Sequence, residues 1–171
     1  MSAELPDFDP EEAQRRQDAA AAKLPALLAA SRAEGADVAE RRAFWSATLH
    51  LPHWIFIARG ESANPSPFVV YAGPQGDIPT VLVFSSAESA LAVGRSAGLT
   101  SEEASLLLAV PLPQAIDWVA SLAAAGVSMA QFEAQDEGGL VIPVHLLPAM
   151  RDDLLGPVAT DEAGEAETPQ S

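Results

Sequence analysis

The segment Val81-Leu82-Val83-Phe84-Ser85-Ser86-Ala87-Glu88 joins two different patterns. Its first half is apolar and rich in β-branched residues, which is typical of a central strand. A pair of serines then precedes a helical pattern, and serine is a preferred N-cap residue. The segment therefore predicts a strand that passes directly into a helix, with Ser85 or Ser86 as the cap.

Other apolar runs on both sides of this segment predict further strands. Short runs separated by Gly, Pro, Asn and Ser clusters predict an antiparallel meander up to Phe84. A fourth run, ending at Val110, is apolar enough to lie inside the sheet, and a hairpin is expected across the turn at 136–139. The predicted strands cover Trp54–Ala58, Phe68–Tyr71, Thr80–Phe84, Leu106–Val110, Val127–Glu133 and Leu140–Val144.

Capping residues and helical periodicity predict the helices. Asp9 is placed to cap a first helix with Pro10 at its first position, Pro25 kinks or restarts this helix, and Gly35 ends it. Asp37 is placed to cap a second helix that reaches Leu49. Three later helices are predicted: 88–97 with Leu91 on its inner face, 114–126 with Ile116, Val119, Ala120 and Ala123 on one face, and 146–155.

The composition fits one domain. The chain has 171 residues, of which 49% are hydrophobic, enough for a single packed core. We predict an α/β fold of the α+β type: a mixed, largely antiparallel sheet of about five to six strands packed with helices, and an N-terminal helical extension. The expected parts are a disordered acidic N-terminus over 1–8, a helical segment over 9–35, the α/β domain over 36–155 and a disordered acidic tail over 156–171.

Charge and composition exclude several functions. The net charge is −15, with the excess concentrated at the two ends, and phosphate binding needs clustered Lys and Arg, so we expect no nucleic-acid partner. An anionic membrane surface would repel the chain. The absence of cysteine excludes disulfides and thiolate chemistry. With no signal-peptide pattern and no run of about 18 apolar residues, we expect a cytoplasmic protein, and we expect no cofactor.

Histidines raise the question of a metal site. His50 and His53 stand close in the sequence, and His145 could complete a three-histidine set. Pro52 interrupts the helical spacing that would aim the first two imidazoles at one ion, and no carboxylate has a ligand spacing to them. We therefore predict exposed histidines in a helix-to-strand connection and no metal.

A ligand groove is the remaining hypothesis for a site. Its candidate residues are His50, His53, Trp54, Asp77 and Arg95, which distant elements would have to bring together. The three tryptophans of the chain each lie in an amphipathic or strand pattern, which favours a place in the core over a place in a groove.

No catalytic motif is predicted. Ser85 and Ser86 lack the flanking glycines of a nucleophile elbow, which favours helix capping. Gly73-Pro74-Gln75-Gly76 lacks the lysine and the following helix of a phosphate loop and predicts a hairpin turn. The pairs Glu102-Glu103 and Asp152-Asp153 are adjacent in sequence and seldom face one another, so we interpret them as solvated charges.

Four segments carry a resemblance to a known family: Phe44–Leu49, Trp54–Arg59, Val81–Glu88, and Val110–Leu112 with the Trp118 helix behind it. Read in order, they are similar to the SseB N-terminal domain family, named for enhanced serine sensitivity. The resemblance spans about Ala36 to Leu155. It implies a helix that feeds a strand, a variable hairpin, a strand-to-helix junction and a later strand, helix and hairpin, and it implies no catalytic residue or cofactor.

One segment departs from the family pattern. Many members have an Asn-Pro-Gly-type turn after the strand that follows the last long helix, whereas this chain has Gln131–Asp136. Any role tied to that turn is not carried over.

Two functional hypotheses follow. The first is a non-enzymatic bacterial interaction or regulatory module that binds a protein partner, because an α/β core with acidic ends carries no convergent polar triad. The alternative is a small-molecule-binding or hydrolytic protein whose site combines His50, His53, Asp77 and Arg95.

Overall fold

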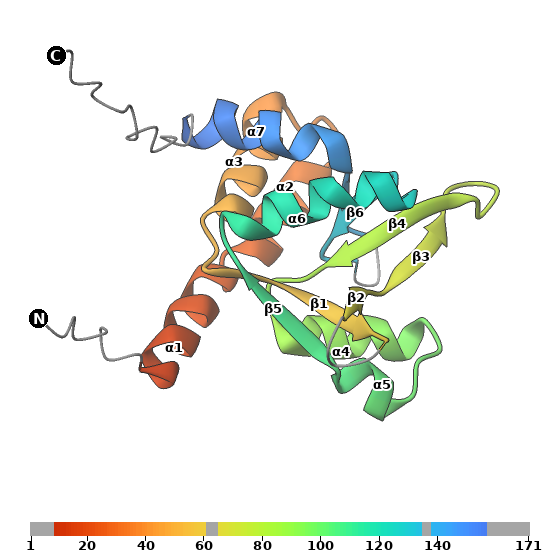
Figure 1. Cartoon of the computed structure of the whole chain (residues 1–171). Coiled ribbons are helices and arrows are strands. Elements are labelled where there is room, and N and C mark those ends of the chain that lie inside the picture. The colour runs from red at the N-terminus through yellow and green to blue at the C-terminus, as the bar shows by residue number, and fades with distance from the viewer. Residues whose placement is uncertain (1–8, 61–64, 135–137, 157–171) are drawn as a thin grey trace, which may run out of the picture.

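The computed structural model describes residues 9–60, 65–134 and 138–156. In these ranges the chain has an α+β fold, which confirms the predicted fold class (Figure 1). The strands form a three-stranded sheet in the order β2-β1-β5 and a four-stranded sheet in the order β3-β4-β6-β7. The strands are β1 His53–Arg59, β2 Ser66–Pro67, β3 Val69–Ala72, β4 Ile78–Val83, β5 Leu107–Pro111, β6 Met129–Phe132 and β7 Leu140–Pro143.

Helices cover both faces of the strands. Figure 1 shows α4 and α5 on one side and α6 and α7 on the other, with α1 to α3 at the β1 end of the molecule. The helices are α1 Pro10–Ala21, α2 Leu24–Arg32, α3 Val38–Leu49, α4 Ala87–Ser96, α5 Ser101–Ser105, α6 Gln114–Ser121 and α7 Leu147–Leu155, with short 3-10 helices η1 Leu122–Ala125 and η2 Val144–Leu146.

The predicted meander is wrong for its first strand, because β1 pairs with β2 and β5 rather than with β3. The segment that follows β2 stays paired with β1 as far as Phe68, whose N–H donates to the Ile57 carbonyl at 2.8 Å. From Val69 onward the same segment, as β3, pairs with β4. At the other end of β1, Ile55 and Phe84 exchange two hydrogen bonds of 2.9 Å. The two sheets therefore meet along β1, whose main partner comes about 50 residues later, a distance that local periodicity cannot reveal.

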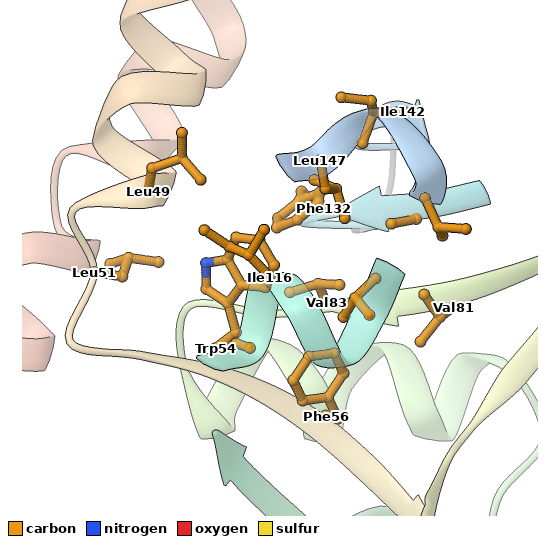
Figure 2. Packing of buried hydrophobic residues seen from close by; sticks show 14 of the residues in the cluster. Leu49, Leu51, Trp54, Phe56, Val81, Val83, Ile116, Phe132, Ile142 and Leu147 are labelled. Atoms are coloured by element: carbon orange, nitrogen blue, oxygen red, sulfur yellow. The ribbon is translucent and has the colours of Figure 1, made fainter. Parts of the chain in front are cut away.

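Alternation along β1 divides the core in two. Trp54 and Phe56 point into the larger cluster with α6 and α7, where Figure 2 shows them beside Ile116. Ile55 and Ile57 point into the smaller cluster against α4. Successive residues of a strand face opposite sides, so this single strand anchors both helical layers.

Local signals place the N-terminal helices as predicted. The Asp9 side chain accepts hydrogen bonds from two backbone N–H groups of the first turn of α1. Pro25 lies in the first turn of α2, where the helix restarts. Asp37 and Glu40 form a reciprocal capping box at the start of α3.

The predicted junction between β4 and α4 is confirmed. Ser86 is the N-cap, with its hydroxyl accepting from the Ser89 N–H at 3.1 Å. The inner face of α4 is not centred on Leu91, which is half-buried, but on Ala90 and Val93. The helix begins at Ala87, one residue before the predicted start. Its most buried apolar residues, Ala90 and Val93, are close in sequence to Leu91, so the buried face is turned slightly from the predicted one.

Two predictions for the segment after α5 need correction. The strand β5 is an edge strand and does not lie inside the sheet. Helix α6 ends at Ser121 and the chain continues as η1, so Ala123 is exposed. A 3-10 turn has three residues instead of 3.6, which moves the apolar stripe out of register. Gly126 ends this segment with φ +89°, as its position predicts.

The C-terminal part follows the prediction. The strands β6 and β7 form an antiparallel hairpin, and α7 follows. Residues 135–137 of the connecting turn, and the ends 1–8 and 157–171 for which disorder is predicted, lie outside the described residues. Within the described ranges no helix combines the length and apolar character needed to cross a membrane.

Candidate functional site

The buried amide of Gln17 ties α1 to the sheet. Its Oε1 accepts from the His53 N–H at 3.1 Å, and its Nε2 donates to the carbonyls of His53 at 3.1 Å and Ser85 at 2.7 Å. The side chain thereby acts as one more strand residue beside β1. Because Gln17 is only 4% exposed, water has little access to its amide group. The three hydrogen bonds satisfy the amide in place of water.

Glu133, at the end of β6, binds the N–H of Ser85, the residue whose carbonyl Gln17 binds. Its carboxylate Oε1 accepts from the Ser85 N–H at 2.5 Å, and its own N–H donates to the Val83 carbonyl at 3.1 Å. Its φ of +53° lies in the left-handed region, which costs a residue with a Cβ about 1–3 kcal/mol. Residues held in this region are enriched at functional sites, which makes Glu133, only 8% exposed, a candidate site residue.

A hollow of about 250 Å³ opens beside these residues, and we call it the junction hollow. One wall is apolar and comes from the turn between α1 and α2. The facing wall is polar and comes from the β4–α4 junction and the end of β6. The lining residues are Ala21, Ala22, Pro25 and Leu28 on the first side, and Ser85, Ser86, Ser89 and Glu133 on the second.

Ser85 is one of the residues that line the junction hollow. Its hydroxyl has no hydrogen-bond partner in the part of the chain that the structure describes. It is not sealed in the interior, because every enclosed side-chain nitrogen or oxygen of the described residues has a partner. Ser85 is only 6% exposed, and the hollow that it lines borders this residue.

The outer edge of β5 is a second feature of interest. The Ala58 N–H donates to the Leu106 carbonyl and the Leu112 N–H to the Pro52 carbonyl, so even-numbered residues of this segment bond to β1 and its continuation. In an antiparallel pair the alternate residues point their backbone groups away. The N–H and C=O groups of Leu107 and Ala109 therefore lie on the free edge, and no hydrogen bond from another described segment reaches them.

The end of β5 leads to a second hollow, of about 410 Å³, which we call the α7 hollow. Its walls are mostly apolar and combine the α3–β1 connection, the β5–α6 connection and the end of α7. Arg151 is the charged residue in its wall and bonds Asp152 at 2.9 Å and Asp117 at 3.1 Å. Burial opposes the charge of Arg151, but the two carboxylates outweigh it and raise the pKa.

The five residues named for a groove lie on separate elements. His50 is the C-cap of α3, His53 begins β1, and Trp54 is fully buried beside it. Asp77 lies in the β3–β4 turn and Arg95 near the end of α4. The β3–β4 turn and the α3–β1 connection lie at opposite ends of the molecule (Figure 1). None of the five lines the junction hollow or the α7 hollow, and the groove stays a prediction.

The histidines and tryptophans have identifiable surroundings. His50 Nδ1 lies 2.7 Å from the Ser46 carbonyl, and His145 is exposed in η2. Among the described residues no group of three or more His, Cys, Asp or Glu side chains could hold a metal ion. The interpretation of the tryptophans as core residues is confirmed, since Trp54 packs edge-on against Phe132 and the other two tryptophans pack against the same cluster.

The adjacent carboxylates have separate partners, as expected of solvated charges. Glu103 binds Arg59 at 3.0 Å and caps α5, while Asp153 binds Arg42 of α3 at 2.6 Å. The Gly73–Gly76 segment is the β3–β4 turn, closed by a 3.0 Å bond from the Gly76 N–H to the Gly73 carbonyl.

Sequence reasoning missed Gln17 and Glu133, the two residues that organise the junction hollow. Gln17 stands in a polar helix whose other faces are exposed, and Glu133 ends a strand without a motif. Neither residue carries a sequence signal for its role, because the left-handed conformation falls on a glutamate rather than on a glycine or asparagine. Compared with known proteins, the chain matches no protein-family model, no curated protein sequence and no solved structure.

Proposed function

We propose that this chain is a non-enzymatic interaction module of the SseB-like type that binds an extended segment of a protein partner. The free edge of β5 carries the proposal. A segment that adds as a strand gains main-chain hydrogen bonds, while pockets for alternate side chains give specificity. The outward groups of Leu107 and Ala109 supply two donors and two acceptors for such a strand.

The β5 edge carries an outward proline only at its last residue, Pro111, and is otherwise apolar. Its sequence, Leu-Leu-Ala-Val-Pro, has no charge, and Leu106 just before it is 52% exposed. The β7 edge also ends in an outward proline, Pro143, but between its ends it has one outward N–H group, that of Val141, where β5 has two. An apolar edge with free N–H and C=O groups is a site of partner binding or of aggregation, and the acidic chain opposes aggregation.

The surroundings indicate the chemistry of the partner. Residues 65–134, which include β5, contain six acidic side chains and one basic one. Leu112 and Pro113 directly follow the strand and line the α7 hollow, which can receive an apolar side chain at the end of the bound segment. These features favour an extended segment that combines Lys or Arg with apolar residues.

The hydrolytic alternative has less support. His50 and His53 lie near the α3–β1 connection, whereas Asp77 and Arg95 lie in a turn and a helix elsewhere. A nucleophile and its base have to lie within hydrogen-bond reach, about 2.6–3.2 Å or one water molecule apart. In the described ranges no hydrogen bond or ion pair joins any two of these four side chains.

Peptide selection tests the proposal. A display library of random linear peptides is selected on the full chain, and recovered peptides are measured by titration against variants. Ala109→Pro removes an outward N–H that β1 does not use, so it blocks strand addition at low cost to the fold. Tyr71→Pro on β3 is the matched control at another edge.

The variants separate the outcomes. We expect basic-apolar peptides whose binding falls at least about tenfold with Ala109→Pro, because one main-chain hydrogen bond is lost and the proline ring crowds the added strand, and is unchanged with Tyr71→Pro. Ala109→Lys, which changes an exposed side chain, serves as a second blocking variant if proline disturbs the fold, as judged by circular dichroism. Selection without any binding peptide, or binding that both Ala109 variants retain, would overturn the proposal.

A further inference from the structure

We propose that the junction hollow binds the ammonium group of a small aliphatic amine. The inference is independent of the β5 edge and rests on three features of the hollow. These are a carboxylate with an unused oxygen, a buried hydroxyl without a partner and an opposing apolar wall.

The Glu133 carboxylate supplies the charge. Its Oε1 is bound to the Ser85 N–H, whereas its Oε2 has no hydrogen-bond partner in the described ranges. No ion pair reaches it there either. Glu133 is only 8% exposed, but its Oε2 is not enclosed, because every enclosed side-chain oxygen of the described residues has a partner, so a cation in the hollow can bind it and complete the site.

Ser85 supplies a second ligand group in a fixed position. Glu133 binds its N–H and Gln17 binds its carbonyl, so the peptide units on both sides of this residue are held. The hydroxyl of this lining residue is therefore carried by a rigid backbone. An ammonium group has three donors and no acceptor, which suits a carboxylate oxygen and a hydroxyl oxygen together.

The site does not suit an anion. The start of α4 would attract negative charge, but the Glu133 carboxylate already lies at the Ser85 N–H next to this helix end. Among the described residues, those that line the hollow include no Lys or Arg. A phosphate or carboxylate ligand would meet the charge of Glu133 without a compensating cation.

The size and the facing wall define the rest of the ligand. A volume of about 250 Å³ corresponds to roughly eight water molecules at about 30 Å³ each, which fits a small molecule. Pro25 and Leu28 face the polar groups from α2, so the ligand carries a short hydrocarbon chain. The same chemistry occurs in a free alkylamine and in a lysine side chain.

The experiment uses n-butylammonium with the full chain and records backbone amide shifts by NMR. Butan-1-ol is the neutral probe of similar shape, and butyrate is the anionic one. Nα-acetyl-lysine methylamide tests whether the group can belong to a peptide. We expect saturable shifts at Ser85, Ser86 and Glu133 with butylammonium, and at least about tenfold weaker binding of the other two butyl probes. Equal or tighter binding of acetyl-lysine methylamide assigns a lysine side chain, and weaker binding assigns a free amine.

Three variants test the assignment of residues. Glu133→Gln keeps an oxygen that can accept from Ser85 and removes the charge, so it should weaken butylammonium at least about tenfold. Glu88→Gln, an exposed acid in the first turn of the same helix, should leave binding unchanged. Ala22→Phe fills the hollow from an exposed position and should abolish binding even if Glu133→Gln disturbs the fold.

Three results would overturn the inference. The first is equal affinity for butylammonium and butanol. The second is butylammonium affinity that survives both Glu133→Gln and Ala22→Phe. The third is a set of shifts confined to exposed acids such as Glu88, which would show general attraction to an acidic surface.

Discussion

Gln17 and Glu133 show how two polar side chains can fix a single residue of the backbone. Ser85 receives a hydrogen bond at its carbonyl from one and donates its N–H to the other. Buried backbone groups need partners, and the strand ladder ends at Phe84, so side chains replace it here. The residue that links β4 to α4 is thereby held by α1 and by the end of β6.

The first prediction concerns Gln17. Replacing it with alanine leaves the His53 N–H and two carbonyls without their partner in a site with little access to water. We expect Gln17→Ala to lower the free energy of unfolding by about 1–3 kcal/mol, measured by urea denaturation. Gln14→Ala, on an exposed face of the same helix, is the control and should change it by less than about 0.5 kcal/mol. Equal effects of the two would mean that the Gln17 bonds add nothing.

The second prediction concerns the pH dependence of the α5 cap. The Thr100 N–H and hydroxyl, then Arg59, lower the pKa of the Glu103 carboxyl below its usual 4.5. A lowered folded pKa adds stability above the unfolded pKa, and this is lost as pH falls through the folded value. We therefore expect Glu103→Gln to lower the melting temperature slightly near neutral pH, with the difference from the parent chain vanishing in acid. Thermal scans across this pH range check it, and a difference that grows in acid would contradict it.

At the scale of elements, local signals and the β6–β7 hairpin were readable from the sequence, and the pairing of distant strands was not. Asp9, Asp37 and Ser86 cap helices because each stands at the right distance from a backbone N–H, a relation within three residues. The partner of β1 is β5, far along the chain, and nothing local indicates that β5 lies at an edge. The junction hollow was likewise unreadable from the sequence, because its lining combines α1, α2, the β4–α4 junction and the end of β6. Its residue types, Ala, Pro, Leu, Ser and Glu, form no motif in the sequence, and only the folded chain places them side by side.

The contact between α4 and α5 gives the third prediction. Gly94 packs so closely that a Cβ would lie 2.9 Å from the Ala104 Cβ and 3.0 Å from the Ile57 Cδ1. Alanine in a helix gains at most about 1 kcal/mol over glycine, whereas an extra methyl in a packed core costs about 1–3 kcal/mol. We expect Gly94→Ala to be destabilising in urea denaturation.

A double-mutant cycle separates the clash from helix propensity. Ala104→Gly removes the nearest atom, so Gly94→Ala should cost less in that background than in the parent chain. Equal costs in both backgrounds would show that the two helices tolerate the methyl and that the contact is not limiting.

At the scale of the molecule, charge and packing are divided between different parts of the chain. The net charge is −15, but five acids lie in residues 1–12 and four in 156–171, whereas the packing described above comes from residues 9–156. Repulsion among surface charges is screened by salt within about 10 Å at 0.1 M. Within the described residues the fold depends on its apolar clusters and on contacts such as those of Gln17. Of the acids near the ends, Asp9 caps α1 and Glu12 pairs with Arg16, and those in 1–8 and 157–171 lie outside the described residues.

The last prediction tests this division by truncation. Removing 1–8 and 157–171 takes away acidic, polar segments without periodic apolar residues, so the melting temperature should change by less than about 2 °C, the effect of well under 1 kcal/mol in a domain of this size. Removing 1–22 also takes away α1, with the Gln17 bonds and the contacts of Ala20 and Ala21 with the larger cluster. This second truncation should lower the melting temperature by at least about 4 °C, because more than 1 kcal/mol is lost. A large loss in the first truncation would mean that an acidic end docks on the core, and no loss in the second would mean that α1 is not needed to close the β4–α4 junction.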